Sequence, residues 1–322
     1  MKIKKRIIDI LSLFIWKIGF HKHETNLVNK YYTDKRKPVN DKRYISVMVD
    51  GRQIHGGFAD RLRGITSIYY FCKKNKIPFF IHYIYPFNLE DYLEPNNVEW
   101  RFKKVQGEIC YNKKYSQPVC LQEWMLPHKF HKLYLLIRWY FSNKSLHIYT
   151  NSHFDYDKFS ICYKDLFKPS SKLEEHINRN LKELGSEYTA IVLRFQQLLG
   201  DFKEGNFKVL NDSERLLLIK KCVEKIKELH TEGERFLVTS DSCTFLNEIS
   251  KLDFVYTIPG KVTHIDYPQK NAEDTFIKSF VDFYMIANAK YIYLLKTSDM
   301  YQSGFPKTAS MMYGKKIETL YF

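Results

Sequence analysis

The fold is decided by residues 56–65, which read G-G-F-A-D-R-L-R-G-I. The β-rich run at 44–49 before them predicts a buried strand, and residues 66–74 and 78–83 after them predict a helix and a second strand. A glycine-rich turn between a strand and a helix lets backbone N–H groups approach a polar or anionic ligand. Two glycines alone more often mark an ordinary turn. The whole stretch predicts a β-α-β unit with a ligand-binding loop.

A second series of strands and helices lies further along the chain. Residues 188–194 predict a strand that ends in Arg194, and residues 212–229 predict a helix leading to a strand over 235–239. Ligands of open α/β sheets bind at the carboxyl ends of the strands, where a guanidinium can hold a phosphate. Asp241 follows the next strand and is suited to ribose or base. A surface salt bridge for Arg194 and a helix cap for Asp241 are the alternatives.

The last block of sequence repeats the alternation. Residues 280–287, which include Asp282, predict a helix, and residues 291–295 predict a strand. The residues Ser303-Gly304-Phe305 then predict the start of another helix, whose N–H groups suit an anion. An ordinary helix cap is the other interpretation of Ser303.

Length and composition define the class of protein. The 322 residues fit two domains of roughly 150 residues each. A content of 44% hydrophobic and 16% aromatic residues excludes a disordered chain. The repeated strand-helix pattern predicts an α/β protein with two Rossmann-like domains facing a cleft. The predicted boundaries are 1–30 for an N-terminal segment, 40–175 for the first domain and 176–322 for the second.

Charge and cysteine spacing limit the partners. The net charge is +15 and the pI is near 9.3, which favours anionic partners. Nucleic acid is not expected, because Lys and Arg are scattered and no helix-turn-helix, zinc-finger spacing or RNP-like strand accompanies them. The six cysteines form no C-x-x-C pair and predict buried free thiols in a reducing compartment. A basic surface facing an anionic membrane is the expectation.

The N-terminal residues 1–20 predict an amphipathic helix. Their apolar stretch is too short, and too interrupted by Asp9 and Lys17, to cross a bilayer. Lysines stand opposite an apolar face that consists of Ile7, Ile10, Leu11, Phe14, Ile15 and Ile18. This pattern predicts an anchor on the inner, cytoplasmic face of the membrane, with an ordinary packed helix as the alternative.

The stretch at 56–65 resembles the first-domain signature of the fucosyltransferases related to the core α-1,6, nodulation-factor and protein O-fucosyltransferases. The run P-F-N-L-E-D-Y-L at 86–93 is similar to the segment that follows it in bacterial members. The resemblance implies a GT-B fold, with an N-terminal acceptor domain and a C-terminal domain that binds a nucleotide sugar. It implies donor contacts from Gly56, Gly57, Phe58, Asp60 and Arg61.

The second domain also resembles that family. The strand before Arg194 is similar to one that ends in H-x-R-R-x-D, whose first arginine binds the β-phosphate of GDP; this chain departs from the motif at Val192, Phe195 and Gln197. The strand before Asp241 resembles the family's nucleotide-recognition segment, and the last block resembles its third motif, an S-G-F turn on the pyrophosphate. The donor-binding residues so implied are Arg194, Asp241, Asp282, Ser303, Gly304 and Phe305.

These features predict an inverting glycosyltransferase that moves fucose from GDP-fucose to a hydroxyl group of a glycan, or of a lipid-linked glycan, in surface polysaccharide synthesis. Arg194 would stabilise the leaving diphosphate. Asp201 and Glu204, in the loop after Arg194, are the candidate bases, with Asp60 as a rival. A GT-B enzyme that uses a UDP-sugar or GDP-mannose, and an inactive nucleotide-sugar-binding protein, are the alternatives.

No resident cofactor and no metal are expected. No D-x-D-like pair is well placed in the sequence, and Arg194 with the Ser303 turn would neutralise the diphosphate. The competing interpretation is a metal site built from Asp241 and Asp282, which are distant in sequence.

Overall fold

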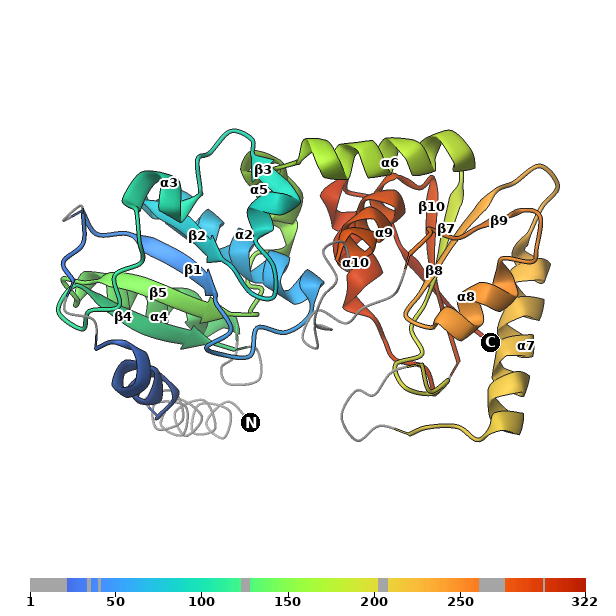
Figure 1. Ribbon diagram of the computed structural model, residues 1–322, viewed down its shortest axis with the longest axis horizontal. Coiled ribbons are helices and arrows are strands. Elements are labelled where there is room, and N and C mark those ends of the chain that lie inside the picture. Colours follow the sequence, from blue (N-terminus) through green and yellow to red (C-terminus); the bar gives the residue numbers. More distant parts are fainter. Residues whose placement is uncertain are drawn as a thin grey trace, which may run out of the picture. The chain divides into compact units, whose positions relative to one another are not determined.

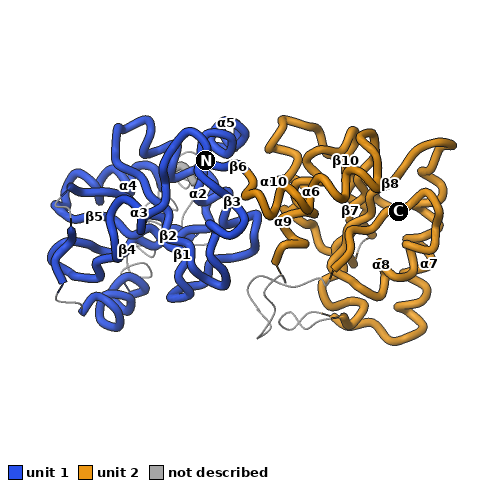
Figure 2. Tube along the Cα trace, turned by 45° about the horizontal axis from the view of Figure 1, so that its top comes forward, with its two compact units in different colours: residues 1–168 blue, residues 169–322 orange. Residues whose placement is uncertain are grey.

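The computed structural model describes residues 22–33, 36–39, 42–122, 128–201, 208–260, 276–297 and 299–322, apart from the side chains of 128 and 129. The predicted amphipathic segment 1–20 and Glu204 therefore lie outside the described residues. The chain divides into two compact units, residues 1–168 and 169–322 (Figure 2). A boundary after residue 175 would cut the helix α6 (Ser171–Leu184), and the division instead leaves this helix whole in the second unit.

The first unit is built on a parallel sheet of four strands in the order β2-β1-β5-β4 (Figure 1). The strands are β1 (Ile45–Val49), β2 (Phe79–Tyr83), β4 (Ser116–Leu121) and β5 (Ser145–Thr150). In the centre, Val47 pairs with Ile81 on one side and Ile148 on the other. All five residues of β1 are buried, as expected for a parallel strand covered on both faces.

The helices of the first unit connect these strands. They are α2 (Phe58–Asn75), α3 (Phe102–Gln106), α4 (His128–Tyr140) and α5 (Phe159–Leu166), with a further helical stretch over 22–31. Short elements complete the unit: the 3-10 helices Leu89–Asp91 and Tyr156–Lys158, and the strands β3 (Leu93–Pro95) and β6 (Phe167–Pro169).

The glycine-rich turn is shorter than predicted. The sequence pattern placed the helix start at residue 66, but α2 begins at Phe58, directly after Gly57. Asp60 closes a capping box by accepting the Gly57 N–H at 3.1 Å. An acid at this position satisfies a backbone donor that would otherwise be unpaired at the helix start, so residues 58–65 form the first two turns of the helix.

The second unit contains a parallel sheet of five strands in the order β11-β10-β7-β8-β9. The strands are β7 (Thr189–Leu193), β8 (Phe236–Ser240), β9 (Val255–Tyr256), β10 (Tyr291–Lys296) and β11 (Glu318–Tyr321). The helices are α6, α7 (Asp212–Leu229), α8 (Cys243–Ile249), α9 (Ile277–Asn288) and α10 (Gly304–Met312). Helix α7 has the predicted bounds, because Asn211 caps it and Glu214 completes a capping box.

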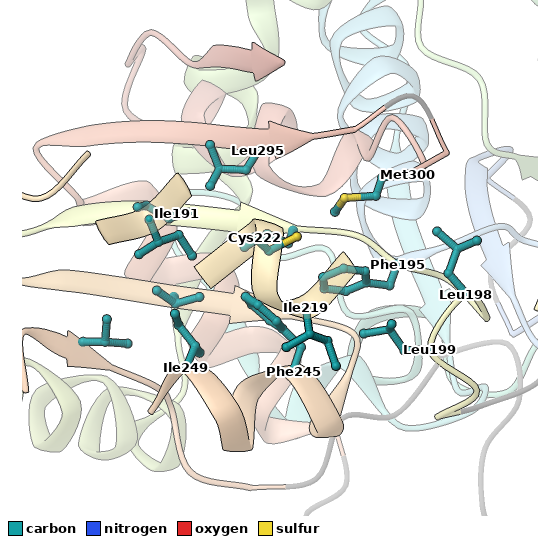
Figure 3. Close-up of a cluster of buried hydrophobic side chains, with 14 of the residues drawn as sticks. Ile191, Phe195, Leu198, Leu199, Ile219, Cys222, Phe245, Ile249, Leu295 and Met300 are labelled. Carbon is teal, nitrogen blue, oxygen red and sulfur yellow. The ribbon is translucent and has the colours of Figure 1, made fainter. Parts of the chain in front are cut away.

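Buried side chains anchor the loop that follows β7. Figure 3 shows Phe195, Leu198 and Leu199 gathered with residues of the α7 and α8 helices. The rings of Phe195 and Phe245 lie 5.0 Å apart between centroids. Burying an apolar side chain of this size contributes roughly 1.5–3 kcal/mol. The loop after β7 is therefore part of the core, and its position is fixed by packing.

The cysteines are all reduced. Five of the six are buried, as predicted, and Cys243 at the start of α8 is partly exposed. Among the described residues, no helix is long and apolar enough to span a bilayer.

Candidate active site

The strand order of the second unit defines where a ligand would bind. The chain runs outward from β7 through β8 to β9, and then returns to place β10 on the other side of β7. The strand order therefore reverses between β7 and β10, and the carboxyl ends of these strands are the usual ligand site of an open α/β sheet. Arg194 follows β7, and Ser303 lies in the connection after β10. The backbone N–H of Tyr301 donates to the Arg194 carbonyl at 3.3 Å, which joins the two loops.

Arg194 and Asp241 form an ion pair at this edge. Their closest atoms, Nη1 and Oδ2, are 3.0 Å apart, and the side chains are 20% and 4% exposed. The Arg194 side chain is thus partly exposed while its partner is buried. Arg194 and Asp241, predicted separately from two strand ends, are brought together because β7 and β8 are neighbours.

Asp241 also fixes the backbone beside Arg194. Its carboxylate accepts the N–H groups of Phe195 at 2.8 Å and Gln196 at 2.7 Å. Gln196 has a φ of 53°, a left-handed conformation that is unfavourable for a residue with a side chain. Burial raises the pKa of Asp241, while Arg194 and the two N–H donors oppose that rise. Asp241 therefore holds the turn that presents Arg194, whereas the cap of α8 is Ser242.

Asp201 anchors the start of α8. Its carboxylate accepts the Ser242 hydroxyl at 2.6 Å and the N–H and hydroxyl of Thr244 at 2.9 and 2.8 Å. These three bonds connect the loop after Arg194 to the residues that follow Asp241. They give Asp201 a structural role that the sequence did not predict. The assignment of Asp201 or Glu204 as a base stays a prediction.

The start of α10 has the predicted capped geometry. The Ser303 hydroxyl accepts the Phe305 N–H at 3.3 Å, and α10 begins at Gly304. A β-carbon added at Gly304 would meet no atom within 4 Å, so the backbone here is open to a ligand. The Phe305 ring packs against Phe283 of α9, with centroids 5.3 Å apart.

Asp282 lies on α9 and is paired with a lysine one turn earlier. The Lys278 ammonium lies 2.9 and 3.0 Å from the two carboxylate oxygens, and the side chains are 4% and 13% exposed. Burial raises the pKa of Asp282, and Lys278 opposes that rise. Asp241 and Asp282 each have a basic partner. The described parts of the chain contain no group of three His, Cys, Asp or Glu side chains that could hold a metal ion.

The predicted glycine-loop residues form a separate cluster in the first unit. The Arg61 guanidinium donates to the Gly56 carbonyl at 2.8 Å, to the Tyr83 hydroxyl at 2.9 Å and to the Tyr85 carbonyl at 3.0 Å. Arg61 is buried, and Asp60 pairs with Arg63. Both side chains therefore stabilise the loop itself, and the donor contacts assigned to them stay predictions.

Known structures share this architecture. The chain has the GT-B fold of the fucosyltransferases. A mutant of FUT1 from Arabidopsis thaliana, in complex with GDP, matches 98% of this chain and 79% of its own length at 13% identity, with a TM-score of 0.51. NodZ α-1,6-fucosyltransferase soaked with GDP-fucose matches 84% of this chain and 93% of its own length at 13% identity, with a TM-score of 0.50. NodZ from Bradyrhizobium gives the same coverage and TM-score at 12% identity. No protein-family model and no curated protein matches the sequence.

His55 lies at the edge of the first sheet where the strand order also reverses. In the first unit the order reverses between β1 and β5, and the loop after β1 carries this residue. His55 is buried, and its Nε2 accepts the Gly51 N–H at 3.3 Å. Burial and the charge of Arg61 lower the pKa of His55 to about 4. In the sequence, His55 could have been noticed only because it directly precedes Gly56 of the glycine-rich turn.

Asp50 organises the same edge of the first sheet. It accepts the hydroxyl groups of Tyr111 at 2.9 Å and Tyr149 at 3.0 Å, and the Arg52 N–H at 3.1 Å. The Arg52 guanidinium lies 3.6 Å from the centre of the Tyr111 ring. The tyrosines come from distant segments, so the sequence pattern could not identify this group. It holds the start of the glycine loop in place.

Proposed function

We propose that this chain is an inverting glycosyltransferase that transfers fucose from GDP-fucose to a hydroxyl group of a glycan. The observation that carries the proposal is the Arg194–Asp241 pair at the strand-order reversal of the second sheet, in a chain with the GT-B fold. Structures of the same fold hold GDP or GDP-fucose. A guanidinium held by a buried carboxylate is suited to a diphosphate at this place.

The proposed reaction breaks the bond between the anomeric carbon and the diphosphate oxygen. The acceptor hydroxyl attacks that carbon, loses its proton to a base, and GDP leaves with the bonding electrons. Negative charge therefore grows on the leaving diphosphate, where Arg194 and the N–H groups at the start of α10 would stabilise it. Asp241 keeps the turn that carries Arg194 in its left-handed conformation, which positions the guanidinium before the donor arrives.

We assign the remaining predicted residues by their chemistry. Asp282, held by Lys278, is assigned to the donor site, and Gly56, Gly57 and Phe58 are assigned to the sugar end of the donor. The first unit would bind the acceptor, a glycan or lipid-linked glycan of surface polysaccharide synthesis. Residues 1–20 would hold the enzyme at the anionic inner face of the membrane. No metal takes part in this scheme.

Calorimetry with GDP, UDP and CMP tests the donor site. We expect GDP to bind most tightly, and Arg194→Ala to weaken it by roughly 2–3 kcal/mol, at least about 30-fold in Kd. Arg194→Lys keeps a charge beside Asp241 and should also weaken binding, because an ammonium cannot form a bidentate contact. Arg179→Ala, which removes an exposed arginine on α6, is the matched control.

Three results would decide against parts of the proposal. Unchanged GDP affinity in Arg194→Ala would reject the assignment of this residue. Preferential binding of UDP would reject GDP-fucose as the donor. Tight GDP binding with neither hydrolysis nor transfer of GDP-fucose would indicate a binding protein without activity.

A further inference from the structure

Helix α4 of the first unit displays an apolar surface to solvent. We define the α4 stripe as Leu133, Ile137, Tyr140 and Phe141, which are 53%, 45%, 68% and 89% exposed. Their spacing of four, three and one residues places them on one helical face. The Phe141 N–H donates to the Ile137 carbonyl at 3.0 Å, so this residue continues the last turn of the helix. The stripe is therefore continuous over the C-terminal half of α4.

The opposite face of α4 is fixed in the unit. Leu135 and His131 are fully buried, and His131 Nδ1 lies 2.5 Å from the Ser152 hydroxyl oxygen. Arg138 donates to Glu24 at 2.5 Å, and the Tyr134 hydroxyl donates to the same carboxylate at 3.1 Å. These contacts hold α4 against the sheet and against the helical residues 22–31. The exposure of the stripe is thus a property of a well-packed helix.

Basic groups flank the most exposed end of the stripe. Arg43 stacks on Trp139, with 3.9 Å between the guanidinium carbon and the ring centre, and donates to the Trp139 and Ser142 carbonyls at 3.0 and 2.5 Å. Lys144 lies three residues after Phe141. In the part of the chain that the structure describes, the two acids that form ion pairs with α4 are Glu24, paired with Arg138, and Asp155, paired with Lys132.

This combination is suited to an anionic lipid surface. Consecutive aromatic residues, Trp139, Tyr140 and Phe141, belong to the types that concentrate at the boundary between headgroups and acyl chains. An amphipathic helix with basic residues at its border lies in that boundary with its apolar face buried. The net charge of +15 attracts the whole molecule to the same surface. The Glu24–Arg138 pair also joins α4 to the helical residues 22–31, which come soon after the segment 1–20 in the sequence.

We propose that the α4 stripe is a membrane-binding surface that inserts into the interface of an anionic bilayer. It is a contact in addition to the one assigned to residues 1–20, and it does not depend on which nucleotide the second unit binds.

Vesicle flotation of the full chain tests this surface. The vesicles are phosphatidylcholine alone, or phosphatidylcholine mixed with phosphatidylglycerol. The test variant is Leu133→Gln/Ile137→Gln/Phe141→Gln, and the matched control is Val209→Gln/Leu216→Gln/Leu217→Gln, which removes equally exposed apolar side chains from the second unit. We expect the α4 variant to bind the anionic vesicles about tenfold more weakly, because binding scales with the apolar area that is inserted. The control should bind like the original chain.

A second measurement reports insertion directly. The original chain has four tryptophans, so its own emission is the reference. When anionic vesicles are added, the Trp emission of Phe141→Trp should shift further to shorter wavelength than that of the original chain, whereas the emission of Leu217→Trp should shift no further than the original. Equal vesicle binding by the two triple variants would overturn the proposal. The proposal would also be overturned if the original chain does not bind vesicles but forms an oligomer in sedimentation that the α4 variant does not form. That result would identify the stripe as a contact between copies of the chain. GDP affinity should be the same in all variants, which separates this test from that of the donor site.

Discussion

His147 is a buried histidine whose two ring nitrogens both contact tyrosine hydroxyl groups. Its Nδ1 lies 2.9 Å from the Tyr32 oxygen, and its Nε2 lies 3.2 Å from the Tyr44 oxygen. Burial lowers the pKa of His147 to about 3, with help from the charges of His82 and Arg52. A neutral imidazole provides one donor and one acceptor, which matches two hydroxyl groups that can take either role. Tyr32, directly after the helical residues 22–31, and Tyr44, directly before β1, are thereby joined to β5 through an uncharged ring.

We expect the protein to lose stability as the pH falls below 6.5. The unfolded chain takes up a proton at His147 near pH 6.5, while the folded chain does so only near its lowered pKa of about 3, so the unfolded state binds more protons between these values. The free energy of unfolding should fall by up to about 1.4 kcal/mol per pH unit from this one residue. Urea unfolding of the original chain and of His147→Gln at several pH values measures the difference.

The free energy of unfolding of His147→Gln should vary less steeply with pH than that of the original chain. The difference in slope should correspond to the uptake of at most one proton. His176→Gln, which changes a partly exposed histidine on α6, should keep the original slope. A slope that is equal in the original chain and in His147→Gln would contradict the prediction.

At the scale of residues, the sequence predicted which side chains stand at strand ends. Arg194 and Asp241 were found because each stands directly after a β-rich run, and parallel neighbours bring such ends together. The anchor formed by Asp201 was not predictable, because Ser242 and Thr244 lie more than forty residues away and approach it only when the loop after β7 packs into the core.

At the start of α10, the helix-capping role of Ser303 can be tested separately from the proposed diphosphate site. Aspartate is as good an N-cap as serine, but it places a negative charge where the diphosphate is proposed to bind. Ser303→Asp should therefore keep the unfolding temperature of the original chain while raising the Kd for GDP at least about tenfold. Thermal unfolding and calorimetry on the same sample measure the two effects.

Asn211→Asp is the control for this prediction. It adds the same charge at the capped start of α7 and should leave GDP affinity unchanged. A Ser303→Asp protein that binds GDP as well as the original chain would exclude the α10 start from the phosphate site.

At the scale of elements, helix starts were predictable where a strong cap is present in the sequence. The pattern N-D-S-E gave the start of α7 correctly, because both sides of its capping box are formed by side chains. The start of α2 was missed by eight residues, since glycine has no side chain to cap with and Gly57 was assigned to a turn. The signal that could have found it was Asp60, three residues after the cap.

At the scale of the whole molecule, we expect transfer without a divalent metal ion. The charge on the leaving diphosphate would be balanced by Arg194 and by the start of α10, which chelation does not remove. Activity with GDP-fucose should therefore survive EDTA and gain little from added Mg²⁺ or Mn²⁺. Turnover that EDTA abolishes and either ion restores would contradict this prediction and point to Asp241 and Asp282.

The division into two sheets was predictable from the repeated strand-helix alternation and the chain length. The boundary was predicted after residue 175, inside α6, although the second unit begins at Pro169 and Ser170 caps α6. The tyrosine group around Asp50 was also beyond prediction, since its members come from β5 and from the segment before β4. Such contacts depend on strand order, which the alternation of apolar residues does not specify.

The partial exposure of Cys243 offers a labelling position beside the proposed donor site. Five thiols are buried, so a chromogenic disulfide should react quickly with one cysteine of the native protein and with the other five only after unfolding. Cys243→Ser should remove the fast phase, and a fast phase that persists would mean that another thiol reacts. Because Cys243 stands two residues after Asp241, a dye attached to it would sit beside the turn that presents Arg194. The unaltered sequence thus already contains a single attachment point for a fluorescent reporter of donor binding.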